Sequence, residues 1–145
     1  MSARISARAP FAETFTWPVR VYWEDTDAGG IVYYANYLKF FERSRTEWLR
    51  AKGIDQHALR EATGGMFVVS QADVRYQKSA RLDDALLVTT SLREAGRASM
   101  TIHQQAFLTA STPVLLCEAT VRAGWVNAST LKPDRIPTQI LHALT

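Results

Sequence analysis

Residues 24–52 read EDTDAGGIVYYANYLKFFERSRTEWLRAK, and this stretch decides the fold that the sequence predicts. Short acids and two glycines open it, which is typical of a turn or a functional loop. From Tyr34 onward apolar residues recur at helical spacing, so a long helix is predicted over residues 34–52. Cations in its last turn and Gly53 just beyond it favour a helix end there. One helix face should be buried, and its members are Tyr37, Phe40, Phe41, Ser44, Trp48 and Leu49.

Strand patterns flank this helix on both sides. Residues 15–23 alternate apolar and polar, and Pro18 favours an edge strand or a strand entered through a bulge. Further strands are predicted at residues 66–76, 85–92, 99–107 and 114–125, with short helices at 55–61 and 138–144. The last three strands follow one another through short connections, so they should pair antiparallel.

The predicted fold class is α+β, with one long helix wrapped by a curved antiparallel sheet of about five strands. We expect a single domain over residues 14–145, preceded by a flexible arm at residues 1–13. The outer face and the edges of such a sheet invite pairing with another subunit.

Composition excludes several classes of protein. The chain has 145 residues and a net charge of +3, which fits either plain solubility or a modest preference for an anionic partner. The sequence has no dense Lys/Arg run with interleaved aromatics, so binding of nucleic acid is not favoured. The single cysteine, Cys117, lies in an apolar run and is expected in the core. Residues 1–10 lack the apolar segment of a secretory signal, and no stretch is long enough to span a membrane, so the cytoplasm is the expected location.

Three acids within four residues, Glu24, Asp25 and Asp27, form the densest cluster of candidate functional groups. An ordinary solvated turn is one interpretation. A calcium loop is another, but position five is Gly29 and position twelve is Asn36, so two ligands of the EF-hand pattern are missing.

A third interpretation joins the acid to the helix start. The first N–H groups of a helix have no internal partner and carry partial positive charge, so they can polarise a carbonyl oxygen as an oxyanion hole does. Asp27 precedes Tyr34 closely enough to reach the same carbonyl if the glycine loop curls back. A carboxylate there could attack the carbonyl carbon or activate a water.

Other chemistry finds little support. The three histidines (His57, His103 and His142) show no metal-ligand spacing and are expected to be structural or exposed. The sequence holds no serine-hydrolase elbow and no nucleotide-binding glycine pattern. The aromatic stripe on the helix is expected to be core, and part of it could line an acyl tunnel.

Residues 21–47, VYWEDTDAGGIVYYANYLKFFERSRTE, closely resemble the Tol-Pal-associated acyl-CoA thioesterases of the YbgC type. These belong with 4-hydroxybenzoyl-CoA thioesterase in the hotdog superfamily. The resemblance is strong over residues 18–54 and continues more loosely at residues 76–84 and 132–133.

The resemblance implies a catalytic carboxylate at Asp27, a loop-shaping role for Asp25, and a backbone N–H at Tyr34 that holds the thioester carbonyl. Many YbgC-type members have His where this chain has Tyr34, and Tyr matches the hydroxybenzoyl type. Arg97 and Ser99 are the candidates for binding the phosphates of coenzyme A, which is part of the substrate; no cofactor is implied. The family resemblance also implies homodimers that pair into homotetramers, with the active site at the dimer interface.

The predicted function is hydrolysis of acyl-CoA to free acid and CoA. The alternative is a non-catalytic module that binds acyl thioesters or acyl carrier protein. A hotdog dehydratase is disfavoured because no histidine lies near the helix start. The sequence leaves the acyl chain open, and it does not choose between a nucleophilic and a general-base role for Asp27.

Overall fold

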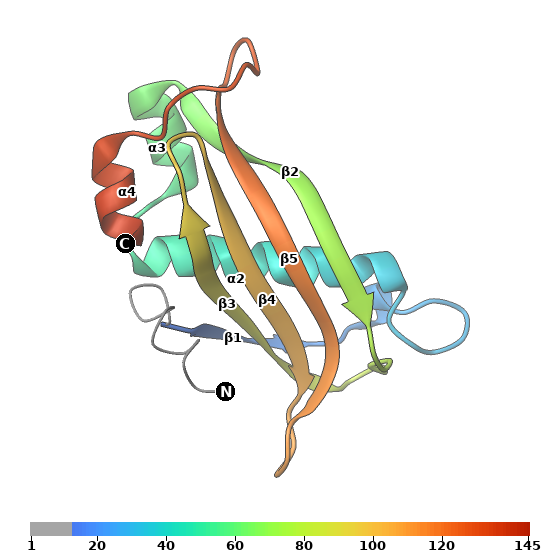
Figure 1. The fold of residues 1–145 in the computed structure, drawn as a ribbon. Coiled ribbons are helices and arrows are strands. Elements are labelled where there is room, and N and C mark those ends of the chain that lie inside the picture. Colours follow the sequence, from blue (N-terminus) through green and yellow to red (C-terminus); the bar gives the residue numbers. More distant parts are fainter. Residues whose placement is uncertain (1–12) are drawn as a thin grey trace.

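The computed structural model describes residues 13–145, so the predicted arm falls almost wholly outside the described residues. The described chain begins with a strand, passes through the long helix, and continues into four more strands (Figure 1). The strands and helices in chain order are β1 (Phe15–Arg20), α2 (Tyr37–Ala51), α3 (Gln56–Thr63), β2 (Gly65–Tyr76), β3 (Ala85–Ala95), β4 (Ser99–Leu108), β5 (Val114–Asn127) and α4 (Thr138–Leu144).

The five strands form one antiparallel sheet in the order β1-β3-β4-β5-β2. The predicted hairpins β3–β4 and β4–β5 are confirmed, whereas the position of β2 beside β5 could not be predicted from the sequence. β1 lies at one edge, as Pro18 indicated, because proline lacks the N–H that a central strand would need. β2, with twelve residues and no proline, forms the other edge.

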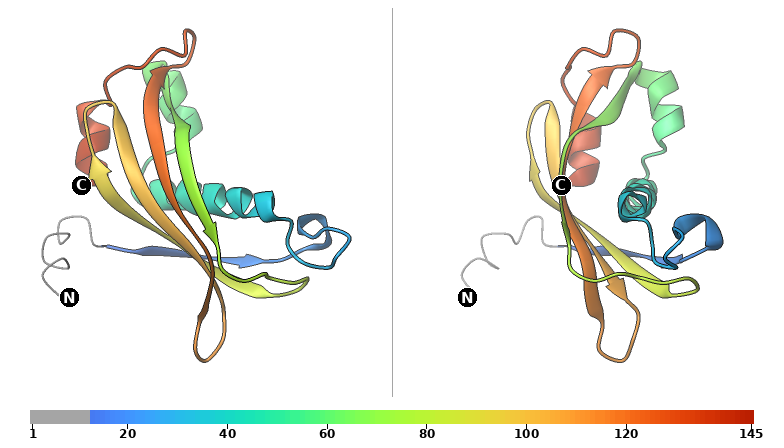
Figure 2. Two further views of the ribbon diagram at one scale, coloured as in Figure 1. Left: turned by 45° about the vertical axis from the view of Figure 1, so that its right-hand side comes forward. Right: turned by 90° about the vertical axis from the view of Figure 1, so that its right-hand side faces the viewer.

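The sheet curves around α2, which lies against its concave face (Figure 2). The predicted buried stripe is confirmed, since all six of its members on α2 are buried. The core divides into two clusters along the helix. Tyr37, Phe40 and Phe41 pack near the helix start with Ala80 and Val88, whereas the cluster near the helix end holds Trp48, Leu49, Leu92, Met100 and Ile136.

Buried polar side chains tie α2 to the sheet. The hydroxyls of Ser44 and Thr90 lie 2.7 Å apart, and the amide of Gln104 donates to Thr90 Oγ1 at 2.8 Å and to the carbonyl oxygen of Phe41 at 2.9 Å. These three side chains are fully buried. Because a buried polar group is costly when unpaired, this network fixes the helix in one position on the sheet.

The first turn of the predicted long helix is not α-helical. Residues Tyr34–Asn36 form a 3-10 turn, and α2 begins at Tyr37. The first strand also ends at Arg20 rather than at residue 23, because the chain turns through a second 3-10 turn at Trp23–Asp25. Both differences have one cause: hydrogen bonds to Asp25 tighten the chain on each side of the acidic loop.

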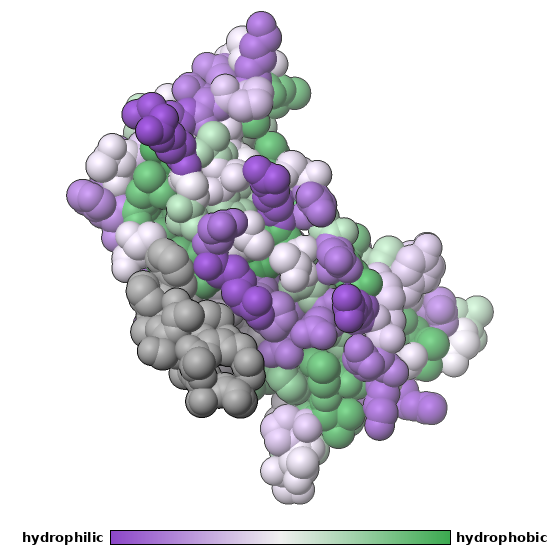
Figure 3. All heavy atoms as spheres, viewed as in Figure 1, coloured by the Kyte–Doolittle hydropathy of each residue, from purple (hydrophilic) through white to green (hydrophobic). Residues whose placement is uncertain are grey.

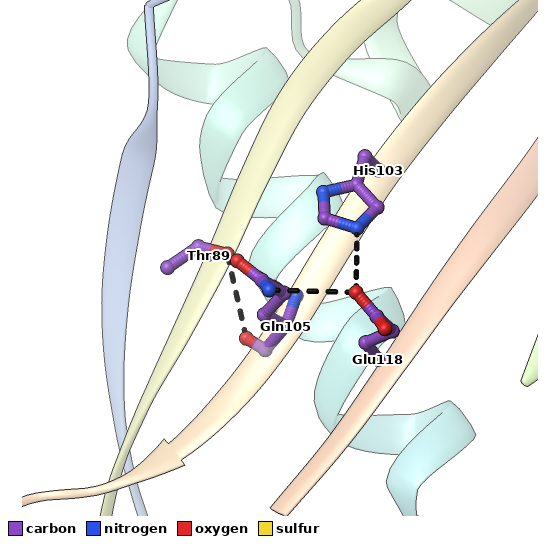
Figure 4. A network of polar contacts seen from close by, with 4 residues as sticks. All are labelled: Thr89, His103, Gln105 and Glu118. Carbon is purple, nitrogen blue, oxygen red and sulfur yellow. Dashed lines mark hydrogen bonds and ion pairs between the residues drawn. The ribbon is translucent and has the colours of Figure 1, made fainter. Parts of the chain in front are cut away.

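The convex face of the sheet is polar, as the hydrophilic side chains over the strands in Figure 3 show. Figure 4 shows part of this face, where Glu118 accepts from Gln105 at 3.4 Å and lies 3.1 Å from Nε2 of His103. The main-chain N–H of Gln105 donates to Thr89 Oγ1. This pairing across strands agrees with the structural role expected for His103.

Gly65, at the start of β2, is required by a close packing contact. A Cβ atom at this position would lie 2.5 Å from ring carbons of the buried Trp125. Gly65→Ala should therefore lower the free energy of unfolding by about 1–3 kcal/mol, measured by urea denaturation. Gly96→Ala is the matched control, because its nearest neighbour, the carbonyl oxygen of Ser99, lies 3.5 Å away. Equal stability of the two variants would contradict this account of Gly65.

Candidate functional site

The acidic loop folds into a tight hairpin turn. The N–H of Asp27 donates to the carbonyl oxygen of Ile31 and the N–H of Gly30 to that of Asp27, both at 3.0 Å. Gly30 has a positive φ of 79°, which glycine adopts without strain. Thr26 and Val32 pair as an antiparallel bridge at the base of the turn. The Asp-x-Gly-Gly sequence thus forms a curled loop, which is the condition that the third interpretation of Asp27 required.

The carboxylate of Asp27 projects from this turn. Its Oδ1 accepts from the N–H of Gly29 at 2.8 Å, as aspartates at the start of turns commonly do. The side chain is exposed in the protomer, and none of the ion pairs among residues 13–145 includes it. The second carboxylate oxygen is therefore available to a ligand or a water.

Asp25 anchors the loop from inside and is only 2% exposed. Its two carboxylate oxygens accept at 2.8 Å, one from the main-chain N–H of Tyr22 and the other from the side-chain amide of Asn36. Its carbonyl oxygen accepts from the N–H of Tyr33. These bonds join the strand before the loop to the helix start after it, which confirms the loop-shaping role predicted for Asp25.

Asp25→Asn should destabilise the protein and displace the loop. An asparagine keeps one acceptor oxygen, but its NH₂ group must face one of the two donors that the carboxylate now satisfies. The expected loss is about 2–3 kcal/mol of unfolding free energy, measured by urea denaturation. Glu24→Gln, which changes an exposed neighbouring acid, should stay within about 0.5 kcal/mol of the unchanged protein. An Asp25→Asn protein as stable as this control would refute the anchoring role.

The helix start offers free hydrogen-bond donors beside the loop. Among residues 13–145, the main-chain N–H groups of Tyr34 and Ala35 have no acceptor. They belong to the 3-10 turn that leads into α2, so they lie at the positive end of the helix dipole. Such groups can hold a carbonyl oxygen and stabilise negative charge that develops on it.

An aromatic cluster surrounds these donors. The Tyr34 ring packs edge-on against Tyr76 at 5.9 Å between centroids and lies tilted against Tyr33 at 5.0 Å. Tyr37 also contacts Tyr76 at 5.9 Å. Tyr37 Oη accepts from the N–H of Ala80, and burial raises the pKa values of both Tyr37 and Tyr76. Both phenols therefore stay neutral; Tyr37 is buried, and the half-exposed Tyr76 contributes surface beside the helix start.

The structure separates the two sets of predicted site residues. Asp27 and Tyr34 lie on the two arms of the same loop, at the right of Figure 1 in blue. Arg97 and Ser99 lie at the β3–β4 hairpin, which Figure 1 shows at the upper left, above the C-terminal part of α2. Arg97 is exposed, its carbonyl oxygen accepts from the N–H of Ile136, and Ser99 Oγ accepts weakly from Arg122 at 3.4 Å. One protomer alone does not bring the two sets together.

A groove between α2 and the sheet was missed by the sequence reasoning. It has a volume of about 210 Å³, and α2 contributes Glu42, Arg45, Thr46 and Leu49 to it. These four residues follow the i, i+3, i+4, i+7 spacing of one helix face, which is the signal that could have found them. Phe67–Val69 of β2 form part of the opposite wall.

Other chemistry has no support among the described residues. Burial raises the pKa of the Cys117 thiol to about 12, so it stays protonated and cannot serve as a nucleophile at neutral pH. Within residues 13–145 no group of His, Cys, Asp and Glu side chains is placed to hold a metal ion. No helix in the same part of the chain is long and apolar enough to cross a membrane.

Comparison with known proteins adds independent findings. The family model described as the thioesterase-like superfamily matches residues 21–144. The acyl-CoA thioesterase YbgC of Haemophilus influenzae is 43% identical over 126 residues, which cover 87% of this chain and 90% of that protein. The YbgC acyl-CoA thioesterase of Helicobacter pylori is 33% identical, with 81% of this chain and 90% of that protein covered.

Solved structures agree with these relatives. A probable thioesterase from Bartonella henselae superposes with a TM-score of 0.79 at 31% identity, covering 86% of this chain and all of that one. The structure of 4-hydroxybenzoyl-CoA thioesterase superposes with a TM-score of 0.86 over 92% of this chain and 100% of that one; at 18% identity this likeness concerns the fold. The architecture is thus the hotdog fold. With matches across most of its length, this chain belongs to the YbgC family of acyl-CoA thioesterases, within the thioesterase-like superfamily.

Proposed function

We propose that the protein hydrolyses acyl-CoA thioesters, with Asp27 as the catalytic carboxylate and the N–H of Tyr34 as a donor to the thioester carbonyl. One observation carries this proposal: the exposed carboxylate of Asp27 and the unbonded main-chain N–H of Tyr34 lie on the two arms of one loop, which Asp25 anchors. The family membership supports the same reaction class.

The reaction adds water across the thioester bond and yields a carboxylic acid and the CoA thiol. The carbonyl oxygen would accept from the Tyr34 amide, and the N-terminal end of α2 would stabilise the negative charge that grows on it. Asp27 would act in one of two ways. It either attacks the carbonyl carbon and expels the CoA thiolate as the C–S bond breaks, which leaves a mixed anhydride that water then cleaves, or it takes a proton from the attacking water.

The active unit we propose is a homodimer joined along β2. The outer edge of β2 is unpaired in the protomer, and β2 lacks the proline that protects the β1 edge. Exposed side chains run along it, among them Val69 at 50% and Tyr76 at 46%. An unprotected strand of this length favours antiparallel pairing with a second copy.

Such a dimer would complete the site. If the two β2 strands overlap fully and antiparallel, the end of one strand lies beside the start of the other. Tyr76, at the end of β2, contacts Tyr34, whereas Phe67–Val69 near its start line the groove. The loop that carries Asp27 would therefore face the groove of the second copy. This supports a site shared between two subunits.

The loop that carries Asp27 and the β3–β4 hairpin lie apart in one protomer (Figure 1). This separation supports a site to which more than one subunit contributes residues. In the proposed homotetramer, Arg97 and Ser99 would bind the CoA phosphates of a thioester that reacts at Asp27 of another subunit. This assembly and a cellular association with Tol-Pal remain predictions from the family resemblance.

Release of free thiol from a panel of acyl-CoA substrates tests the proposed reaction. The panel should hold short aliphatic, long aliphatic and aromatic acyl groups, together with an acyl carrier protein thioester. Hydrolysis of at least one CoA thioester at a rate that depends on Asp27 supports the proposal. Tight binding of a thioester without thiol release would instead identify the non-catalytic module.

A single turnover in water enriched in heavy oxygen separates the two roles of Asp27. Heavy oxygen can enter the Asp27 carboxylate only through an anhydride that water opens at the aspartyl carbonyl. Label in a peptide that contains Asp27 therefore identifies nucleophilic attack. Label confined to the product acid, together with no anhydride trapped by hydroxylamine, supports general-base catalysis.

A further inference from the structure

The groove between α2 and β2 combines apolar walls with an arginine that forms no direct ion pair among the described residues. Leu49, Phe67 and Met100 contribute apolar surface, and the groove's volume of about 210 Å³ exceeds the cavity of about 150 Å³ that holds a benzene molecule. A ring or a short chain of about five carbons therefore fits within the groove. Arg45 is partly buried and lines the same groove.

Arg45 forms no direct ion pair within residues 13–145. One nitrogen of its guanidinium donates to the side-chain oxygen of the buried Gln104 at 2.9 Å, and no carboxylate lies within ion-pair distance. Glu42, one helical turn away, accepts from Thr46 at 2.6 Å and favours the charged form of Arg45 only from beyond ion-pair distance. Burial lowers the pKa of Arg45, which reflects the cost of holding its charge away from water.

The neighbours of Arg45 hold it in place. Gln104 is itself fixed by its bonds to Thr90 and to the carbonyl oxygen of Phe41. The guanidinium therefore has a set position at the wall of the groove, while most of its five N–H donors have no acceptor among the described residues. A positioned, partly desolvated cation of this kind favours an anion, and a carboxylate matches its planar fork.

We infer that the groove binds a short acyl chain whose far end carries a carboxylate, with Arg45 as the residue that recognises it. The substrate class is the CoA monothioester of a short dicarboxylic acid. The inference rests on the proposed function, since the thioester end must reach Asp27 of the second copy. Arg45 acts on binding and selectivity and takes no part in the bond cleavage.

Binding of two stable thioether analogues tests this selectivity without any turnover. S-(4-carboxybutyl)-CoA and S-pentyl-CoA have equal chain length and differ only at the far end. Calorimetric titration of the full chain should show the carboxylated analogue binding at least about tenfold more tightly. Arg45→Met should abolish that preference, and Arg45→Lys should keep part of it because the charge remains.

Arg43→Met is the matched control. Arg43 is an exposed arginine on the same helix outside the groove lining, so its loss changes the net charge equally. The tenfold preference should survive in this variant. Equal binding of both analogues to the unchanged protein, or a preference that persists in Arg45→Met, would overturn the inference. An equal loss in Arg43→Met and Arg45→Met would do the same, because it would point to a general charge effect.

The outcomes separate this inference from the proposed function. Thiol release from acyl-CoA with equal binding of the two analogues overturns the selectivity of Arg45 and leaves hydrolysis standing. A preference for the carboxylated analogue without any thiol release supports the groove assignment and overturns hydrolysis. A carboxylate from the second copy that already neutralises Arg45 would also give equal binding, and Arg45→Met would then weaken the dimer.

Discussion

Asp27→Asn should lower kcat for thioester hydrolysis by about a thousandfold or more while the protein keeps its melting temperature. The lower kcat and the unchanged melting temperature have separate physical reasons. An amide is neither a general base nor an effective nucleophile, so the chemical step is lost. The fold is kept because the asparagine oxygen can still accept from the N–H of Gly29, the one hydrogen bond that the Asp27 side chain makes among the described residues.

Asp134→Asn is a matched control for this substitution. Asp134 is also an exposed turn aspartate whose Oδ1 accepts a nearby main-chain N–H, in this case from Arg135 at 2.8 Å. Its replacement should leave both kcat and the melting temperature unchanged. Thiol release by Asp27→Asn at the rate of this control would remove Asp27 from the mechanism.

Val69→Lys should convert the proposed dimer into a monomer and reduce activity by at least about a hundredfold. Val69 is half exposed in the protomer, so the fold of one subunit should tolerate the lysine. Between two paired β2 strands the same position becomes buried, and the two-fold axis brings both ammonium groups into one small region. Burying two unpaired like charges is costly, and dissociation avoids that cost.

Light scattering and thiol release measured on the same samples check this result. The unchanged protein should show at least twice the chain mass of 16.3 kDa, and Val69→Lys should show the single-chain mass. Leu131→Lys is the control, because Leu131 is 62% exposed and lies in the connection after β5 rather than on the edge strand β2. A fully active Val69→Lys monomer would refute the shared site. Activity that rises with protein concentration would support it, because dimers form by mass action.

The sequence predicted those features that depend on residues close together in the chain. The spacing of the buried stripe predicts α2 because a helix repeats every 3.6 residues. Asp27 and Gly30 predict a turn because their conformational preferences act within four residues. The position of Pro18 on an edge strand follows from a missing N–H. In each case the residues of one short segment were enough to predict the feature.

The predicted start of the long helix was wrong because it depends on a contact between residues that are far apart in the chain. Sequence reasoning extended the long helix back to Tyr34 because it could not see Asp25 binding the amide of Asn36, eleven residues away, and tightening that turn. The phosphate-binding role predicted for Arg97 and Ser99 stays a prediction, because the loop that carries Asp27 and the β3–β4 hairpin lie apart in one protomer.

The sequence by itself determined the family, the long helix, the turn that carries Asp27, and the alternation that forms the strands. These follow from periodicity and turn chemistry within single segments. Only the tertiary structure decided that β2 lies at the open edge beside β5. It also decided that, among the described residues, the amides of Tyr34 and Ala35 stay unbonded and Arg45 lines a groove without a direct ion pair. The reason is physical: burial, desolvation and an unfilled edge depend on which segments pack together, and no single segment carries that information.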